Sequence, residues 1–211
     1  VEFGQSDETP EGGAGLARID HLAETMSYDE MLSWSLFYTS LFQMAPSAMN
    51  DVIDPDGLVR SQAIATPDGS FRVTLNGAET HRTLAGSFLA ESFGAPVQHV
   101  AFATNDIFAT ALALAKSGFA SLPMTENYYA DLVSRFDIPE DQLALMKQHN
   151  ILYDCDDAGA FFQIYSQPFA GGMFFEILER RDHYDGYGAP NAPFRIAAQK
   201  RQMRAKGMPR R

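Results

Sequence analysis

The sequence predicts an α+β domain in which two tandem βαβββ modules form a curved, open sheet around a metal site. Residues 18–23 and residues 97–102 are both strand-like, and aligning His21 with His99, 78 residues apart, also aligns their apolar residues. Each segment is followed by a helical pattern and then by further strand candidates. A repeat of this length favours a duplicated module over a solenoid.

The first module is expected to span residues 16–77. After its opening strand a helix is predicted over residues 28–44, with Ser27 or Asp29 as the N-cap. The apolar face of this helix is expected to comprise Met31, Trp34, Leu36, Phe37, Tyr38 and Leu41. Asp-Gly turn chemistry at residues 67–70 then predicts a hairpin, whose strands are residues 58–66 and 71–76.

The second module is expected to span residues 95–180, after a polar connection at residues 77–94. Asn105 or Asp106 is predicted to cap a helix that runs to Lys116. Two inserted helices are predicted next, at residues 128–136 and 140–149. Three strands follow, at residues 151–154, 160–167 and 173–179.

Two histidines and one acid are the predicted metal ligands. If the modules pack with approximate twofold symmetry, His21 and His99 face each other across the shared cleft. Glu176 lies within an otherwise apolar strand, where a buried carboxylate needs a cation or a base as compensation. Two imidazoles and one carboxylate suit Fe(II), and they also accept Mn, Co, Mg or Zn. Taken singly, each histidine also fits a satisfied core residue, and Glu176 fits a solvent-facing position.

The composition favours a small-molecule ligand. The 211 residues carry a net charge of −11, from 27 acidic and 16 basic residues, which argues against a nucleic-acid partner. No apolar run approaches the roughly 20 residues of a membrane-spanning helix. The single cysteine, Cys155, is expected in the core and can form no internal disulfide, which fits the cytoplasm. We also expect a homo-oligomer.

The two ends of the sequence differ from the expected domain at residues 16–194. Residues 1–15 are rich in Gly, Glu, Asp, Ser and Pro and are predicted to be a linker that follows another domain. Residues 195–211 hold seven bases and no acid. They are predicted to form a solvated basic helix and tail, with anion binding as the alternative. The remaining histidines, expected at the surface, are His81, His149 and His183.

Several separated segments resemble the catalytic half of 4-hydroxyphenylpyruvate dioxygenase, an enzyme of the vicinal oxygen chelate fold. The segments that carry the three ligands are residues 19–21, 97–101 and 174–177 with Arg180, and further segments agree in the same order at residues 58–61, 74–76, 104–107, 162–165 and 186–188. Together they span roughly residues 18–191. The resemblance implies the vicinal oxygen chelate fold, with His21, His99 and Glu176 around one Fe(II).

The resemblance also implies a reaction and a pocket. In the family, Fe(II) binds an α-keto acid and activates O2, which couples decarboxylation to hydroxylation. Carried over by position, the polar groups of the pocket are Ser61, Asn76, Gln98 and Gln163, and its walls are Tyr165 and Phe174. Plain core packing is the alternative for the two aromatic residues.

The C-terminal signature departs from the dioxygenase pattern. Ala192 stands where the family has a pocket-closing aromatic residue, and Phe194 is a candidate substitute from a shifted position. Glu179 stands where the family has Gln. These departures argue against 4-hydroxyphenylpyruvate as the substrate.

Residues 177–181 and 187–193 resemble the dioxygenase-like C-terminal domain of bacterial two-domain 3-dehydroshikimate dehydratases. This resemblance implies a preceding sugar-phosphate-isomerase-like barrel that converts 3-dehydroshikimate to protocatechuate, so that the whole fusion is a lyase. Three functions stay open: the metal domain of such a fusion with a reaction of its own, a free-standing Fe(II) dioxygenase of an aryl α-keto acid, and a non-catalytic scaffold stabilised by metal. For an enzyme, the expected ligand is an aromatic or keto acid.

Overall fold

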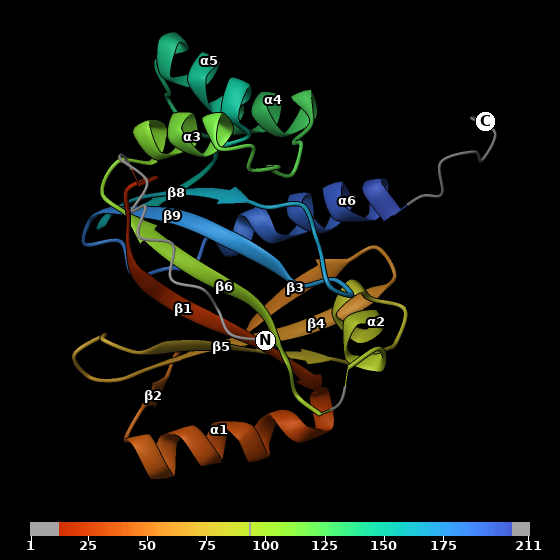
Figure 1. The fold of residues 1–211 in the computed structure, drawn as a ribbon. Helices are drawn as coiled ribbons and strands as arrows, with labels where there is room; N and C mark the ends of the chain where they lie inside the picture. The colour runs from red at the N-terminus through yellow and green to blue at the C-terminus, as the bar shows by residue number, and fades with distance from the viewer. Residues whose placement is uncertain (1–12, 93, 204–211) are drawn as a thin grey trace, which may run out of the picture.

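The computed structural model describes residues 13–92 and 94–203 of the chain (Figure 1). Its strands are β1 (Leu16–Ser27), β2 (Ala45–Pro46), β3 (Asn50–Asp54), β4 (Gly57–Ala65), β5 (Arg72–Ala78), β6 (Val97–Thr104), β7 (Leu152–Asp156), β8 (Gly159–Tyr165) and β9 (Phe174–Asp182). Its helices are α1 (Tyr28–Phe42), α2 (Leu84–Ala90), α3 (Ile107–Lys116), α4 (Glu126–Arg135), α5 (Glu140–His149) and α6 (Ala192–Met203), with a short 3-10 helix at Ala189–Asn191.

The strands form one curved, mixed sheet with β1 and β6 paired antiparallel at its centre (Figure 1). Each central strand has a parallel neighbour, β5 beside β1 and β9 beside β6. The next strands outward, β4 and β8, are antiparallel to those neighbours, and β3 and β7 pair with them in turn. The order of pairing is therefore the same on both sides of the centre, which confirms the predicted α+β fold of duplicated modules.

Three elements that precede β6 were not predicted. β2 and β3 carry mostly exposed residues at one edge of the sheet, so their sequences lack the alternation of a half-buried strand. Helix α2 lies within the expected polar connection at 77–94 and is only seven residues long. Thr83 caps it by accepting a hydrogen bond from the Gly86 amide at 3.0 Å. A helix this short shows little periodicity in its sequence.

The predicted apolar face of α1 is only partly correct. Met31 and Tyr38 are buried against the sheet, but Leu36, Phe37 and Leu41 are exposed. Figure 1 shows α1 on one side of β5 with no described element beyond it. A single helix against a sheet buries only a narrow stripe, so the other apolar side chains of α1 stay exposed to solvent.

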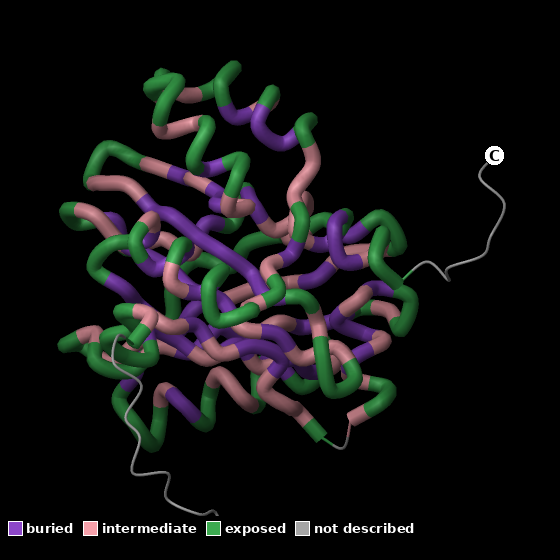
Figure 2. Tube along the Cα trace, turned by 45° about the horizontal axis from the view of Figure 1, so that its top comes forward, coloured by how far each residue is buried: buried purple, intermediate pink, exposed green. Residues whose placement is uncertain are grey.

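The core has a main part in each module. In the first, Met26, Ile64 and Leu75 pack beneath α1. In the second, helices α3, α4 and α5 cover β7–β9, and Tyr128 and Phe162 are among the fully buried side chains there. Figure 2 shows buried segments along the strands and exposed ones along the outer turns of the helices.

Helix α6 is part of the domain rather than a solvated tail. The boundary expected after Phe194 falls inside this helix, and Ile196, Ala198 and Gln199 are buried. Lys200 on α6 forms ion pairs with Asp54 at the end of β3 and with Asp56 in the turn that follows. Residues 1–12 of the expected linker, and residues 204–211 of the basic tail, lie outside the described residues. None of the described helices combines the length and the apolar character needed to cross a bilayer.

Candidate metal centre

The predicted ligands lie on three neighbouring strands, His21 on β1, His99 on β6 and Glu176 on β9. Ala101 of β6 pairs with His21 on one side and with Glu176 on the other. Side chains directly opposite one another across a sheet project to the same face, as do side chains two residues apart on one strand. His99, two residues before Ala101, therefore joins the other two ligands, and the small Ala101 side chain leaves space between them.

The donor atoms of these three residues converge. Nε2 of His99 lies 3.3 Å from Nε2 of His21 and 3.3 Å from Oε2 of Glu176, and that oxygen lies 3.6 Å from Nε2 of His21. The exposed fractions are 3% for His21, 9% for His99 and 2% for Glu176. Donors that bind one ion at about 2.1 Å and at right angles to each other lie about 3 Å apart. The donor set and its spacing therefore fit a single divalent cation.

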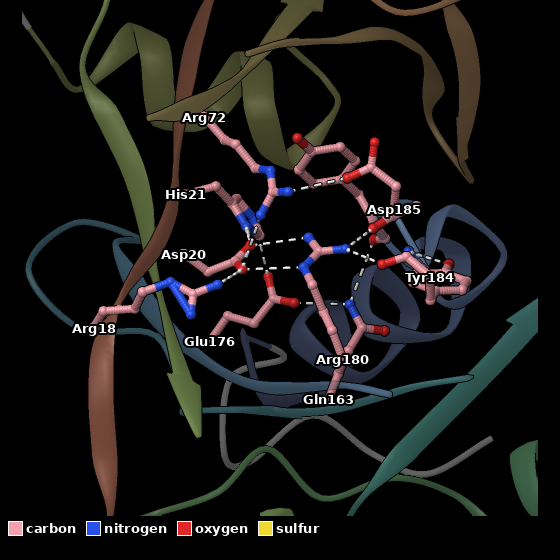
Figure 3. A network of polar contacts seen from close by, with 12 residues as sticks. Arg18, Asp20, His21, Arg72, Gln163, Glu176, Arg180, Tyr184 and Asp185 are labelled. Carbon is pink, nitrogen blue, oxygen red and sulfur yellow. Dashed lines mark hydrogen bonds and ion pairs between the residues drawn. The ribbon is translucent and has the colours of Figure 1, made fainter. Parts of the chain in front are cut away.

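Asp20 fixes the orientation of the His21 ring (Figure 3). Its Oδ1 lies 2.9 Å from Nδ1 of His21, which places the ring proton on Nδ1 and directs the lone pair of Nε2 toward the other ligands. Arg180 holds Asp20 with two hydrogen bonds, Nε to Oδ2 at 3.0 Å and Nη2 to Oδ1 at 2.9 Å. Burial raises the pKa of Asp20, but the hydrogen bonds from His21 and Arg180 outweigh it and hold the pKa well below its usual range.

Gln163 orients Glu176 in the same way. Its Nε2 donates to Oε1 of Glu176 at 2.8 Å, which leaves Oε2 directed at the histidines. Oε1 of Gln163 accepts from Nδ2 of Asn191 at 2.7 Å, and Oδ1 of Asn191 accepts from the Tyr128 hydroxyl at 3.1 Å. Burial raises the pKa of Glu176, so a bound cation would stabilise the ionised carboxylate.

His99 is held by packing rather than by a carboxylate. Its ring stacks on Phe174, with centroids 4.7 Å apart and planes 29° from parallel. Burial lowers the pKa of His99 to about 3, which keeps the imidazole neutral, as a metal ligand must be. Among the described residues, Nδ1 of His99 has no hydrogen-bond partner. The two imidazoles are therefore supported differently, although their strands are equivalent.

Comparison with known proteins finds relatives in both expected groups, the 3-dehydroshikimate dehydratases and the 4-hydroxyphenylpyruvate dioxygenases. No family model matches the sequence. The 3-dehydroshikimate dehydratase of Pseudomonas aeruginosa is 40% identical over 194 residues, which cover 92% of this chain and 31% of the dehydratase. A 4-hydroxyphenylpyruvate dioxygenase of Legionella pneumophila is 30% identical over 194 residues, which cover 90% of this chain and 55% of the dioxygenase.

Solved structures agree with these relatives. A fusion of a xylose isomerase-like TIM barrel with 4-hydroxyphenylpyruvate dioxygenase superposes with a TM-score of 0.77 at 37% identity, over 94% of this chain and 31% of the fusion. A mutant of 4-hydroxymandelate synthase from Streptomyces coelicolor superposes with a TM-score of 0.80 at 25% identity, over 89% of this chain and 54% of the synthase. The chain is a 4-hydroxyphenylpyruvate dioxygenase-like domain of the vicinal oxygen chelate fold. It spans about a third of the dehydratase and about half of the dioxygenase.

The dioxygenase-like domain has a cavity of about 350 Å³ beside the three ligands. Four of the residues expected to contact a ligand line this cavity: Ser61, Asn76, Gln98 and Tyr165. Ser61 and Asn76 are paired in register on β4 and β5, so their side chains reach the cavity from the same face of the sheet. Gln98 accepts a hydrogen bond from the Thr25 hydroxyl at 3.2 Å.

Three other residues expected in the pocket do not line it. Gln163 is fully buried behind Glu176, and Phe174 stacks on His99. Phe194 packs against Tyr128 with ring centroids 5.0 Å apart. The Gln163 and Phe174 side chains therefore support cavity residues from behind, whereas Phe194 packs in the core of the second module.

Tyr187 and Arg195 are among the cavity residues of the dioxygenase-like domain that were not predicted as site residues. Tyr187 lies in one of the resembling segments, and its ring meets the His21 ring edge to face at 5.1 Å. Arg195 was assigned to the basic tail, but it lines the cavity. Of the remaining histidines, His81 and His183 are exposed as expected, whereas His149 is half-buried.

Proposed function

We propose that this domain binds one divalent metal ion, Fe(II) first among the candidates, through His21, His99 and Glu176. We further propose that an aromatic or keto acid with adjacent oxygen atoms binds in the cavity beside them. The observation that carries the proposal is the convergence of three buried donor atoms, all within 4.8 Å of one another. Buried charges and imidazoles with converging lone pairs are costly unless a cation compensates them.

Each part of the chain has a separate task in this site. The metal, when bound, supplies a Lewis acid and, in the case of iron, a redox centre for a ligand with two neighbouring oxygens. Asp20 keeps the proton of His21 on Nδ1, and Gln163 keeps Oε2 of Glu176 directed at the site. Tyr187 covers His21 with its ring, which limits the access of water to the ligands.

We propose that the domain works as the C-terminal part of a 3-dehydroshikimate dehydratase fusion, with a metal-dependent reaction of its own. The match covers the C-terminal portion of the dehydratases, and the fusion of known structure carries a TIM barrel as well. Under this proposal the preceding barrel performs the dehydration, so the whole protein is a lyase. The dioxygenase-like domain then adds oxygenase-type chemistry on an aromatic or keto acid.

A free-standing dioxygenase of 4-hydroxyphenylpyruvate is the second candidate, supported by the 30% identity to the Legionella enzyme. The cavity argues against this particular substrate. Ala192 lines the cavity where the dioxygenases carry an aromatic residue, and Phe194 does not take over that position. A non-catalytic scaffold would keep the metal but show no turnover.

The metal content of the full chain, purified without oxygen, tests the proposal. We expect about one metal ion per chain, and loss of that ion in His99→Ala and Glu176→Gln. His183→Ala, which changes an exposed histidine outside the site, is the matched control and should keep the ion. Retention of one ion per chain by both ligand variants would refute the metal site. Oxygen uptake with Fe(II) and 4-hydroxyphenylpyruvate then separates the second candidate, because the proposal expects none.

A further inference from the structure

Arg195 is an unusual residue in the cavity. It lies in the first turn of α6, and it is the only lysine or arginine among the described residues that line the cavity. Within the described ranges 13–92 and 94–203, Arg195 forms no ion pair with a carboxylate, and its hydrogen bond runs from Nη1 to the neutral Oε1 of Gln199 at 2.8 Å. No carboxylate of the described residues therefore lies within ion-pair distance of the Arg195 guanidinium.

None of the four acidic residues of the cavity forms an ion pair with Arg195, and two of them pair with other bases. Asp54 pairs with Lys200, and Asp185 pairs with Arg72 at 3.1 Å. The two remaining acidic residues accept hydrogen bonds from neutral groups, Asp154 from the Tyr184 hydroxyl at 2.7 Å and Glu176 from the Gln163 amide at 2.8 Å.

Two aromatic rings hold the guanidinium in place. Its central carbon lies 4.9 Å from the centroid of the Phe174 ring and 5.6 Å from that of Tyr165. Such cation–π contacts restrict the position of the planar guanidinium and leave its remaining N–H groups available for an anion. Phe174 also stacks on His99 at 4.7 Å, so the guanidinium is one aromatic ring away from a metal ligand.

We infer that Arg195 binds the carboxylate of an aromatic acid whose two adjacent oxygens face His21, His99 and Glu176. This inference rests on the proposed function for the metal end of the ligand. A guanidinium and a carboxylate form two parallel hydrogen bonds, so the contact fixes the orientation of the ring as well as its charge. A cavity of about 350 Å³ accommodates a compound with a single ring.

The test compares two probes that differ only in the carboxylate, 3,4-dihydroxybenzoate and catechol. Their dissociation constants are measured by calorimetry on the full chain loaded with Zn(II), which supports no redox turnover. The variants are Arg195→Met, which removes the charge, and Arg195→Lys, which keeps the charge without the fork of N–H groups. Arg201→Met removes a charge from an exposed position of the same helix and is the matched control.

We expect wild type and Arg201→Met to bind 3,4-dihydroxybenzoate at least about tenfold more tightly than catechol. This is the gain in affinity that hydrogen bonds between charged groups typically provide. Arg195→Met should bind both probes equally, with its affinity for catechol unchanged. Arg195→Lys should show an intermediate preference, and it serves as the test if Arg195→Met fails to fold.

Equal affinity of wild type for the two probes, or the same preference in the Arg195 variants, would overturn the anion site. Absence of binding by wild type at millimolar concentrations of either probe would overturn it as well. Failure of the metal site is seen separately, as a lack of bound zinc or as probe affinities that zinc does not change. A preference for the carboxylate that depends on Arg195 but not on zinc would retain the anion site and reject the metal site.

Discussion

Replacing Asp20 with asparagine tests how the metal site is supported. The Asp20 side chain is 0% exposed, accepts from Nδ1 of His21 at 2.9 Å and is held by two hydrogen bonds from Arg180. An asparagine of the same shape can accept one of these bonds, but it carries no charge and places an NH2 group against a donor. Asp20→Asn therefore removes the preference of His21 for the Nδ1 tautomer and leaves the charge of Arg180 without its main partner.

Two effects of known size follow from this substitution. Loss of an outer-shell partner lowers metal affinity by about 10–100-fold, or about 1.4–2.7 kcal/mol. Breaking a buried ion pair by removing one partner lowers the free energy of unfolding by about 3–5 kcal/mol. Asp185 provides a matched control, because it also pairs with an arginine, Arg72, but its side chain is 82% exposed. Asp185→Asn should change stability by less than about 1 kcal/mol.

Metal affinity is measured by competition with a coloured chelator, and stability by urea unfolding of the metal-free protein. Asp20→Asn should weaken both, whereas Asp185→Asn should leave both near wild type. If Asp20→Asn binds metal as tightly as wild type, the argument that Asp20 sets the His21 tautomer is refuted. If the two variants unfold alike, the buried ion pair with Arg180 contributes nothing measurable.

Two further predictions concern Glu176 and its support. Glu176→Gln should lower metal affinity by at least about 100-fold, measured by chelator competition. In the metal-free protein it should raise the free energy of unfolding by about 1 kcal/mol, because a neutral amide replaces a buried carboxylate. Urea unfolding measures this gain, and a less stable metal-free variant would contradict it. Gly188→Ala should destabilise by at least about 2 kcal/mol, because φ is +59° and an added Cβ would overlap the Gln163 amide. Gly118→Ala, at φ +81° with open space around the Cβ position, carries only the backbone strain of about 1 kcal/mol and is the control; equal losses in the two alanine variants would show that Gln163 moves aside freely.

Local interactions explain what could be predicted about the elements. Asp106 was expected as one of two candidate caps, and its Oδ1 accepts from the backbone amides of Phe108 and Ala109 at 3.0 and 2.9 Å. The inserted helix at Glu140–His149 has the predicted bounds. Such features depend on residues within one or two turns of each other, so they can be read from the sequence alone.

Which side chains line the cavity is decided by tertiary packing and could be predicted only in part from the sequence alone. Gln163, Phe174 and Phe194 were expected in the pocket. Instead, the Gln163 and Phe174 side chains lie behind Glu176 and His99, and Phe194 packs against Tyr128. Arg195 belongs to a basic segment whose composition favours solvent, and only the packing of α6 beside the sheet brings it to the cavity. The direction in which a side chain turns is decided by neighbours that are distant in the sequence.

The sequence by itself determined the duplicated strands, the register of His21 and His99, and the presence of an acid in an apolar strand at Glu176. Alternation along each strand decides which residues share a face, and this is a local property. Only the tertiary structure decided that β1, β6 and β9 are neighbours, and that Ala101 lies between His21 and Glu176 in register. Strand order and register arise from pairing over long distances in the chain, for which the sequence of one strand carries no signal.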